Sequence, residues 1–155
     1  MSVSSNLLDT IDLDWFAVDQ NGNLAHFASG GSGFVPNDIK SSLTDVGLFA
    51  DYVFDLNETS DTILISENIP NFDSSEKADR YVETFLRMAA KGFYSYDVLE
   101  LTGHDKGYSL IAKPKSPVVI DDIPNQFASG RGISSLIHKV FDKKLLPSDW
   151  DGYLA

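Results

Sequence analysis

The sequence predicts one α+β domain, in which a mainly antiparallel sheet is packed by one long helix (73–91) plus one or two short helices. Three patterns indicate this class: a hairpin running into a glycine-rich loop over 12–36, an amphipathic stretch over 73–91, and two apolar segments around a turn at 102–107. The length of 155 residues and the 43% apolar composition suit one globular domain. We expect residues 1–10, which are polar and serine-rich, to be frayed, and residues 11–155 to form the domain.

The hairpin has the clearest local signals. Its strands are short and rich in aromatic residues, around Trp15 and over 24–28. Between them, Asn21-Gly22 is typical of a type I′ turn, in which both central residues have positive φ. The following segment, 29–33, reads Ser-Gly-Gly-Ser-Gly and lets the backbone turn before 34–36 re-enters packed structure.

The next segments give weaker signals. Asn37-Asp38 can cap a short helix, whose apolar positions Ile39, Leu43 and Val46 lead to a C-terminal Gly47. The dense apolar run over 48–56 fits a helix continuation or a strand, and its periodicity does not decide between them. Residues 62–65 read as a short strand.

The stretch over 73–91 is the strongest helix signal in the chain. Asp73 or Ser74 can cap its N-terminus, and Gly92 ends it. An apolar stripe at i, i+3, i+4 and i+7 spacing comprises Ala78, Tyr81, Val82, Phe85 and Ala89. The opposite face carries charges and is expected to be solvated.

The C-terminal half supplies further strands. Segments 93–101 and 108–113 flank a turn with glycine at both ends, and 118–120 reads as another short strand. Apolar spacing over 133–141 favours a helix over a strand, although the run is short and β-branched at both ends. Residues 145–150 form a tail that we expect to pack through Trp150.

Charge is the strongest global feature. The net charge is −11, and residues 1–79 hold 14 acidic residues against only Lys40 and Lys77. Such a field repels nucleic acid and anionic membranes and attracts a basic protein partner. Residues 1–8 lack the features of a signal peptide, and no apolar run approaches a membrane span, so we expect a soluble cytoplasmic protein.

No local motif supports catalysis, a metal or a cofactor. The chain has no cysteine, and its histidines, His26, His104 and His138, are too far apart to form a recognised metal motif. The glycine-rich loop lacks the Lys-Ser/Thr of a phosphate-binding loop, and no nucleophile elbow is present. The pairs Asp12/Asp14 and Asp121/Asp122 do not continue into a calcium loop, and we interpret them as turn residues.

The opening of the chain resembles a diffuse group of small bacterial proteins that includes immunity-type members of toxin systems. The shared pattern is an Asp-Trp-x-Ala-x-Asp strand, then x-x-Gly-x-x-Ala-x-Phe and a Gly-Gly-x-Gly-x-x-Pro loop. Here it comprises Asp14, Trp15, Ala17, Asp19, Gly22, Ala25, Phe27, Gly30, Gly31, Gly33 and Pro36. The resemblance implies action by binding, and it carries over no functional residue.

We therefore expect an acidic protein-binding domain, an immunity-type inhibitor of a basic toxin. The carboxylates expected to meet the partner are Asp38, Asp45, Asp51, Asp55, Glu58 and Asp61. The alternative is an enzyme or small-ligand-binding domain that uses the loop over 29–36, with His26, Ser29, Gly30, Gly31, Ser32 and Gly33 as its residues. A third hypothesis is a housekeeping domain without a specific partner.

Overall fold

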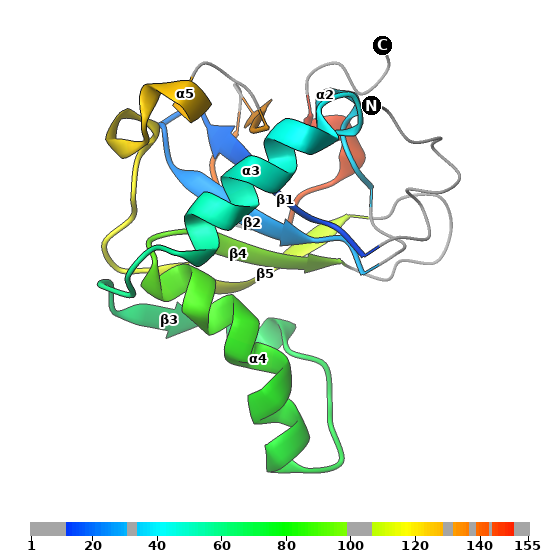
Figure 1. Ribbon diagram of the computed structural model, residues 1–155. Coiled ribbons are helices and arrows are strands. Elements are labelled where there is room, and N and C mark those ends of the chain that lie inside the picture. The colour runs from blue at the N-terminus through cyan, green and yellow to red at the C-terminus, as the bar shows by residue number, and fades with distance from the viewer. Residues whose placement is uncertain are drawn as a thin grey trace.

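The computed structural model describes residues 12–30, 34–98, 107–128, 132–136, 139–142 and 144–150. These residues form an α+β fold around a six-stranded sheet with the strand order β3-β5-β4-β2-β1-β6 (Figure 1). The strands are β1 (Asp14–Asp19), β2 (Leu24–Ala28), β3 (Thr62–Leu64), β4 (Tyr94–Val98), β5 (Tyr108–Pro114) and β6 (Ser134–Leu136). The helices are α2 (Asn37–Lys40), α3 (Leu43–Phe54), α4 (Ser75–Ala90) and α5 (Asn125–Ala128), with short 3₁₀ turns η1 (Ser66–Asn68), η2 (Ile120–Asp122) and η3 (Pro147–Asp149).

The sheet is mixed, so the expected mainly antiparallel sheet is wrong. Strands β1/β2, β4/β5 and β3/β5 pair antiparallel, whereas β2/β4 and β1/β6 pair parallel. The chain between β2 and β4 passes through α2, α3, β3 and α4 before it returns beside β2. Parallel pairing requires a long crossover of this kind, and turn residues in the sequence do not show which strands it brings together.

The first hairpin is present, but its turn is not type I′. The N–H of Gly22 donates to the carbonyl of Asp19 at 3.0 Å, and Gly22 has a φ of +81°, whereas no described residue other than glycine has a positive φ. This is a type I turn followed by a left-handed glycine. The Asp19 carboxylate accepts from the N–H groups of Asn21 and Asn23 at 2.9 Å each, which fixes the loop without a second positive φ.

The helix expected to end at Gly47 is instead two helices. α2 ends at Lys40, and α3 runs from Leu43 through Gly47 to Phe54, so the open question over 48–56 is resolved as helix. Gly47 is exposed within α3, where burial of Val46, Phe49 and Val53 maintains the helix. α3 has 12 residues and α4 has 16, so two helices of comparable length pack on the sheet, whereas the sequence predicted one long helix plus one or two short ones.

The predicted α4 is confirmed, including its cap. The Ser74 side chain accepts from the N–H of Lys77, and Gly92 follows the helix with a φ of +101°. The residues of α4 that are buried are Val82, Phe85, Met88 and Ala89. Ala78 and Tyr81 are only half-buried.

Two expectations in the C-terminal half are wrong. Residues 134–136 form strand β6 beside β1, not part of a helix over 133–141, because buried Ser134 and Leu136 alternate with exposed Ser135. In place of a strand over 118–120, only Val119 bridges to Asn23, and η2 follows. The tail does pack through Trp150, which is 3% exposed.

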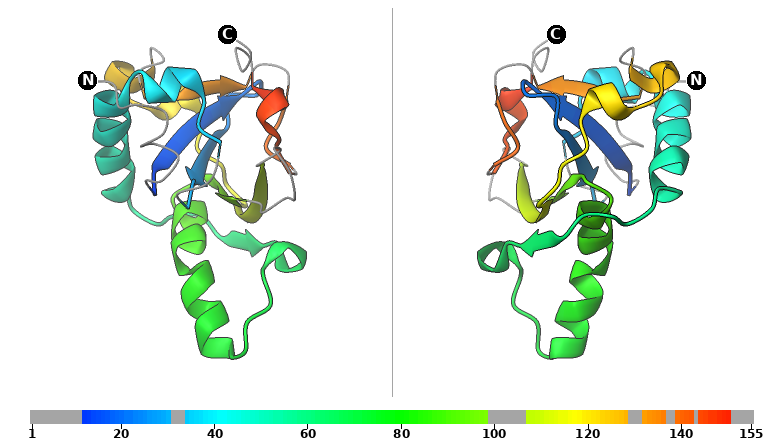
Figure 2. Two further views of the ribbon diagram at one scale, coloured as in Figure 1. Left: turned by 90° about the vertical axis from the view of Figure 1, so that its right-hand side faces the viewer. Right: turned by 90° about the vertical axis from the view of Figure 1, so that its left-hand side faces the viewer.

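Apolar cores lie on both faces of the sheet. On one face, α3 and α4 cover Phe16, Phe93 and Ile111. On the other face, Trp15 and Phe27 stack with ring centroids 4.3 Å apart, and Trp150 meets both at 5.5 Å. Figure 2 shows α3 and the C-terminal segment on opposite sides of the sheet, while α4 extends away from it with β3 alongside. This projection of α4 creates the site described next.

Candidate functional site

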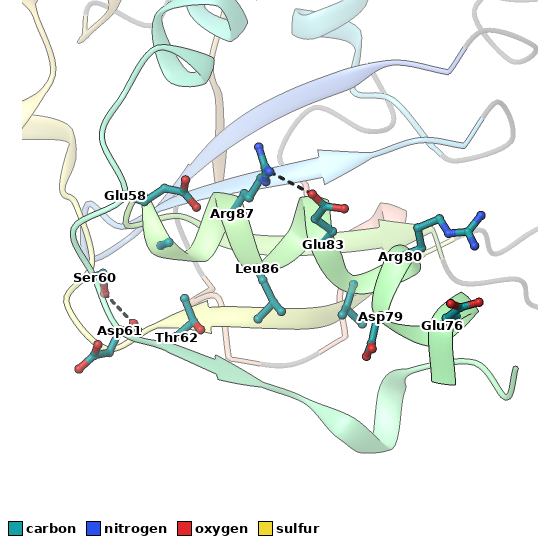
Figure 3. A pocket seen from close by; sticks show the side chains of 12 residues that line it. Glu58, Ser60, Asp61, Thr62, Glu76, Asp79, Arg80, Glu83, Leu86 and Arg87 are labelled. Atoms are coloured by element: carbon teal, nitrogen blue, oxygen red, sulfur yellow. Dashed lines mark hydrogen bonds and ion pairs between the residues drawn. The ribbon is translucent and has the colours of Figure 1, made fainter. Parts of the chain in front are cut away.

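A groove of about 760 Å³ runs between α4 and the start of β3 (Figure 3). Its walls come from the segment 58–62 and from the part of α4 between Glu76 and Ala90. The lining holds five carboxylates, Glu58, Asp61, Glu76, Asp79 and Glu83, against two guanidinium groups, Arg80 and Arg87. We call this feature the acidic groove.

Local hydrogen bonds hold the two walls together. The N–H groups of Thr59 and Ser60 both donate to the carbonyl of Ala90 at 2.8 Å, which ties the 58–62 wall to the end of α4. The Ser60 hydroxyl accepts from the N–H of Ser116 at 2.9 Å. Backbone groups and the Ser60 hydroxyl thus hold the two walls together, and the charged side chains of the groove take no part in these hydrogen bonds.

Most of the groove's negative charge is uncompensated. Arg87 forms an ion pair with Glu83 at 3.0 Å, and both side chains are more than half exposed. In the described part of the chain, no cationic group lies within ion-pair distance of Glu58, Asp61 or Asp79. Figure 3 shows Asp79 and Leu86 on the part of α4 nearest β3, and the Arg87–Glu83 pair on the neighbouring part of the helix, farther from β3.

The six carboxylates predicted from the sequence do not form one cluster. Glu58 and Asp61 line the acidic groove. Asp51 lies on the outer face of α3 and Asp55 directly follows the helix, near Leu48 and Phe54, whose exposed fractions are 56% and 46%. We call this surface the α3 face.

The remaining two predicted carboxylates lie elsewhere. Asp45, in the first turn of α3, borders a hollow of about 420 Å³ together with Leu48, Gln126 and Phe127. Asp38 accepts a hydrogen bond from the Ser134 hydroxyl at 3.0 Å and so connects α2 to β6. Burial raises the pKa of Asp38 above its ordinary value, and the hydrogen bond from Ser134 partly offsets that rise. Asp38 thus has a partner within the fold.

Sequence reasoning missed Glu76, Asp79 and Glu83. Their i, i+3, i+7 spacing places them on one face of α4, and the helical period could have shown this. Their meeting with Glu58 and Asp61 has no such signal, because it depends on how β3 and α4 are placed in the sheet.

His26 lies at the centre of a polar chain in which His26 and Ser95 are buried and the Asp14 side chain is 44% exposed. Its Nε2 is 2.7 Å from Asp14 Oδ1, and its Nδ1 is 2.9 Å from Ser95 Oγ. Because a carboxylate only accepts, Nε2 carries a proton, and in the neutral ring Nδ1 accepts from the Ser95 hydroxyl. Ser–His–Asp connectivity is that of a nucleophilic triad, but His26 and Ser95 are 0% exposed and no substrate reaches them. These two side-chain hydrogen bonds join β1, β2 and β4.

The described part of the glycine-rich loop is also structural. Ser29 is 1% exposed, and its hydroxyl accepts from the N–H of Leu13 at 2.8 Å. The N–H of Gly30 donates to Asp12 at 3.1 Å. Gly31, Ser32 and Gly33 lie outside the described residues.

Comparisons with known proteins leave the site to be interpreted from its geometry. No protein-family model matches the chain, and no curated protein or solved structure is significantly similar to it. None of the described helices is long and apolar enough to cross a membrane. Within the described ranges, no group of three or more histidine and carboxylate side chains is arranged to hold a metal ion.

Proposed function

We propose that this chain is a cytoplasmic protein-binding domain, an immunity-type inhibitor that holds a basic protein partner in its acidic groove. The observation that carries the proposal is the uncompensated charge of Glu58, Asp61 and Asp79 in a groove whose walls are fixed by backbone hydrogen bonds. The sequence resemblance to immunity-type proteins supports the same class.

The physical argument is electrostatic complementarity. Exposed carboxylates remain hydrated and add little to folding stability, so the fold itself does not require their clustering. Clustered charge of one sign instead accelerates the encounter with an oppositely charged protein and discourages wrong partners. The net charge of −11 extends this field over the whole molecule.

Catalysis has less support than binding. The Ser95 hydroxyl and the His26 ring are fully buried, and the described loop residues Ser29 and Gly30 are occupied with contacts to residues 12–13. No described residue between 29 and 36 favours the small-ligand alternative.

Three neutralised variants test the proposal as immobilised baits. The groove variant carries Glu58→Gln, Asp61→Asn and Asp79→Asn. The control variant carries Glu67→Gln, Asp121→Asn and Asp142→Asn, which removes the same charge from exposed positions outside the acidic groove. The α3 variant carries Asp51→Asn and Asp55→Asn.

Each bait is incubated with source-cell lysate at low salt, eluted with a salt gradient and analysed by mass spectrometry. The proposal predicts that the wild type and the control variant retain one basic protein, and that the groove variant loses it. Co-expression with the chain should then relieve that protein's toxicity. Equal retention by the groove and control variants, or loss only with the α3 variant, contradicts the assignment of the acidic groove.

A further inference from the structure

Strand β3 lies at the edge of the sheet and pairs with β5 only. The N–H of Ile65 donates to Ile111 and the N–H of Lys115 donates to Asp61, both at 2.8 Å. Backbone groups alternate in direction along a strand, so residues 61, 63 and 65 face β5. The N–H and C=O groups of Thr62 and Leu64 therefore face away from it, and no described residue bonds them.

This edge lacks most of the features that protect natural edge strands. Its sequence, Thr-Ile-Leu, contains no lysine, proline or inward-pointing charge, and shortness is its only protection. Ile63 and Leu64 are 37% and 36% exposed, and Phe72, beyond the end of β3, is 37% exposed. Unpaired backbone groups beside exposed apolar side chains are the features to which an extended peptide adds as a further strand.

We propose that an extended basic segment of the partner pairs with β3 as an additional strand and places its lysine or arginine side chains over the acidic groove. This inference rests on the proposed function and specifies how the partner binds. It commits to a segment in which basic and apolar residues alternate.

The faces of β3 determine that pattern. Thr62 lines the acidic groove, so the side chain of a partner residue opposite Thr62 projects from the same face, about 5 Å away. Asp79 and Glu76 of α4 line that face. On the other face, the exposed Ile63 side chain lies opposite Lys113 of β5, so an apolar partner residue beside Ile63 would bury apolar surface there.

A second copy of this chain is a poor occupant. Pairing β3 with β3 would bring two acidic grooves together, and like charges across an interface oppose association. Dimerisation is therefore an outcome that the test must detect.

The probe is an acetylated and amidated hexapeptide of alternating lysine and valine. Amide hydrogen exchange measured by NMR should show the N–H groups of Thr62 and Leu64 protected about tenfold on peptide binding, with Ile63 and Ile65 unchanged. The same peptide N-methylated at alternate residues, and a glutamate–valine peptide, should bind at least about tenfold more weakly.

Substitution at Leu64 separates backbone from side-chain effects. Leu64→Pro removes one outward N–H and leaves residues 61, 63 and 65 bonded to β5, while Leu64→Ala removes only side-chain atoms. We expect Leu64→Pro to bind the peptide about tenfold more weakly than Leu64→Ala. If Leu64→Pro does not fold, the N-methylated peptide gives the same comparison on the wild-type chain.

Three results overturn the inference: equal binding of the N-methylated and unmodified peptides, protection of amides other than Thr62 and Leu64, or concentration-dependent protection without peptide, which indicates a dimer. Binding of the captured basic protein separates the two proposals. If the groove variant does not bind this protein but Leu64→Pro binds it as tightly as Leu64→Ala does, strand addition is wrong and the proposed function stands. If the groove variant and Leu64→Pro both bind it as the wild type does, strand addition and the proposed function are both wrong.

Discussion

The hydroxyl of Tyr81 donates a 2.5 Å hydrogen bond to Asp97 Oδ2 and so joins the middle of α4 to β4. Burial raises the pKa of Asp97, and the hydrogen bonds from Tyr81 and from the N–H of Val98 counteract that rise. The contact fixes the helix that forms one wall of the acidic groove.

Removing this hydrogen bond should destabilise the fold more at neutral than at acid pH. In Tyr81→Phe the pKa of Asp97 should rise further, because a bond that favours the ionised form is lost. A pKa that is raised in the folded state above the ordinary value of 3.8 lowers stability as the pH rises through that folded-state pKa. Because the pKa of Asp97 is raised further in the variant, the variant should be less stable than the wild type at pH 7, by about 1–2 kcal/mol.

Urea unfolding at pH 7 and pH 3 measures this difference, and ¹³C NMR follows the titration of the Asp97 carboxyl. Tyr52→Phe is the matched control, because the Tyr52 hydroxyl has no hydrogen bond within the described structure and its ring stacks on Phe49. An unchanged or lowered pKa of Asp97 in Tyr81→Phe contradicts the prediction.

The two hydrogen bonds of the buried His26 ring should contribute to the stability of the fold. Ser95→Ala leaves His26 Nδ1 without its partner at a position with 0% exposure, which should cost about 1–3 kcal/mol of unfolding free energy. Ser135→Ala, at an exposed position, should change it by less than about 0.5 kcal/mol. Urea unfolding measures both variants, and equal unfolding free energies for Ser95→Ala and Ser135→Ala would show that the hydrogen bond between His26 and Ser95 does not stabilise the fold.

Two glycines should respond to alanine in opposite directions. Gly92 has a φ of +101°, and a Cβ there would lie 2.9 Å from the backbone N of Val118, so Gly92→Ala should be destabilising. Gly47 lies inside α3 with no atom within 4 Å of an added Cβ, so Gly47→Ala should stabilise by about 0.5–1 kcal/mol. Thermal unfolding gives both signs, and a shift in the same direction for both contradicts this account.

Local patterns in the sequence predicted the elements whose stability is local. The hairpin at Gly22 and helix α4 with its Ser74 cap follow from turn chemistry and from apolar periodicity. The type of turn did not follow, because the Asp19 carboxylate stabilises an alternative that the Asn-Gly pair alone does not indicate.

Long-range pairing could not be predicted in the same way. The parallel pairs β2/β4 and β1/β6 join segments far apart in the chain. Strand β6 has only three residues, and so short an apolar pattern fits a helix as well as a strand. The same limit applied to the site. The acidity of the N-terminal half was evident, but the fold combines only Glu58 and Asp61 of the six predicted carboxylates with three from α4. Asp38 instead bonds to Ser134, which follows it by 96 positions.

The association rate of the captured basic protein, measured by stopped flow at increasing salt, tests the acidic groove most directly. The wild type and the control variant should show a steep fall in association rate with salt. The groove variant should associate about tenfold more slowly at low salt and respond weakly to added salt. If the groove and control variants have the same rate and the same salt dependence, the acidic groove does not bind the partner.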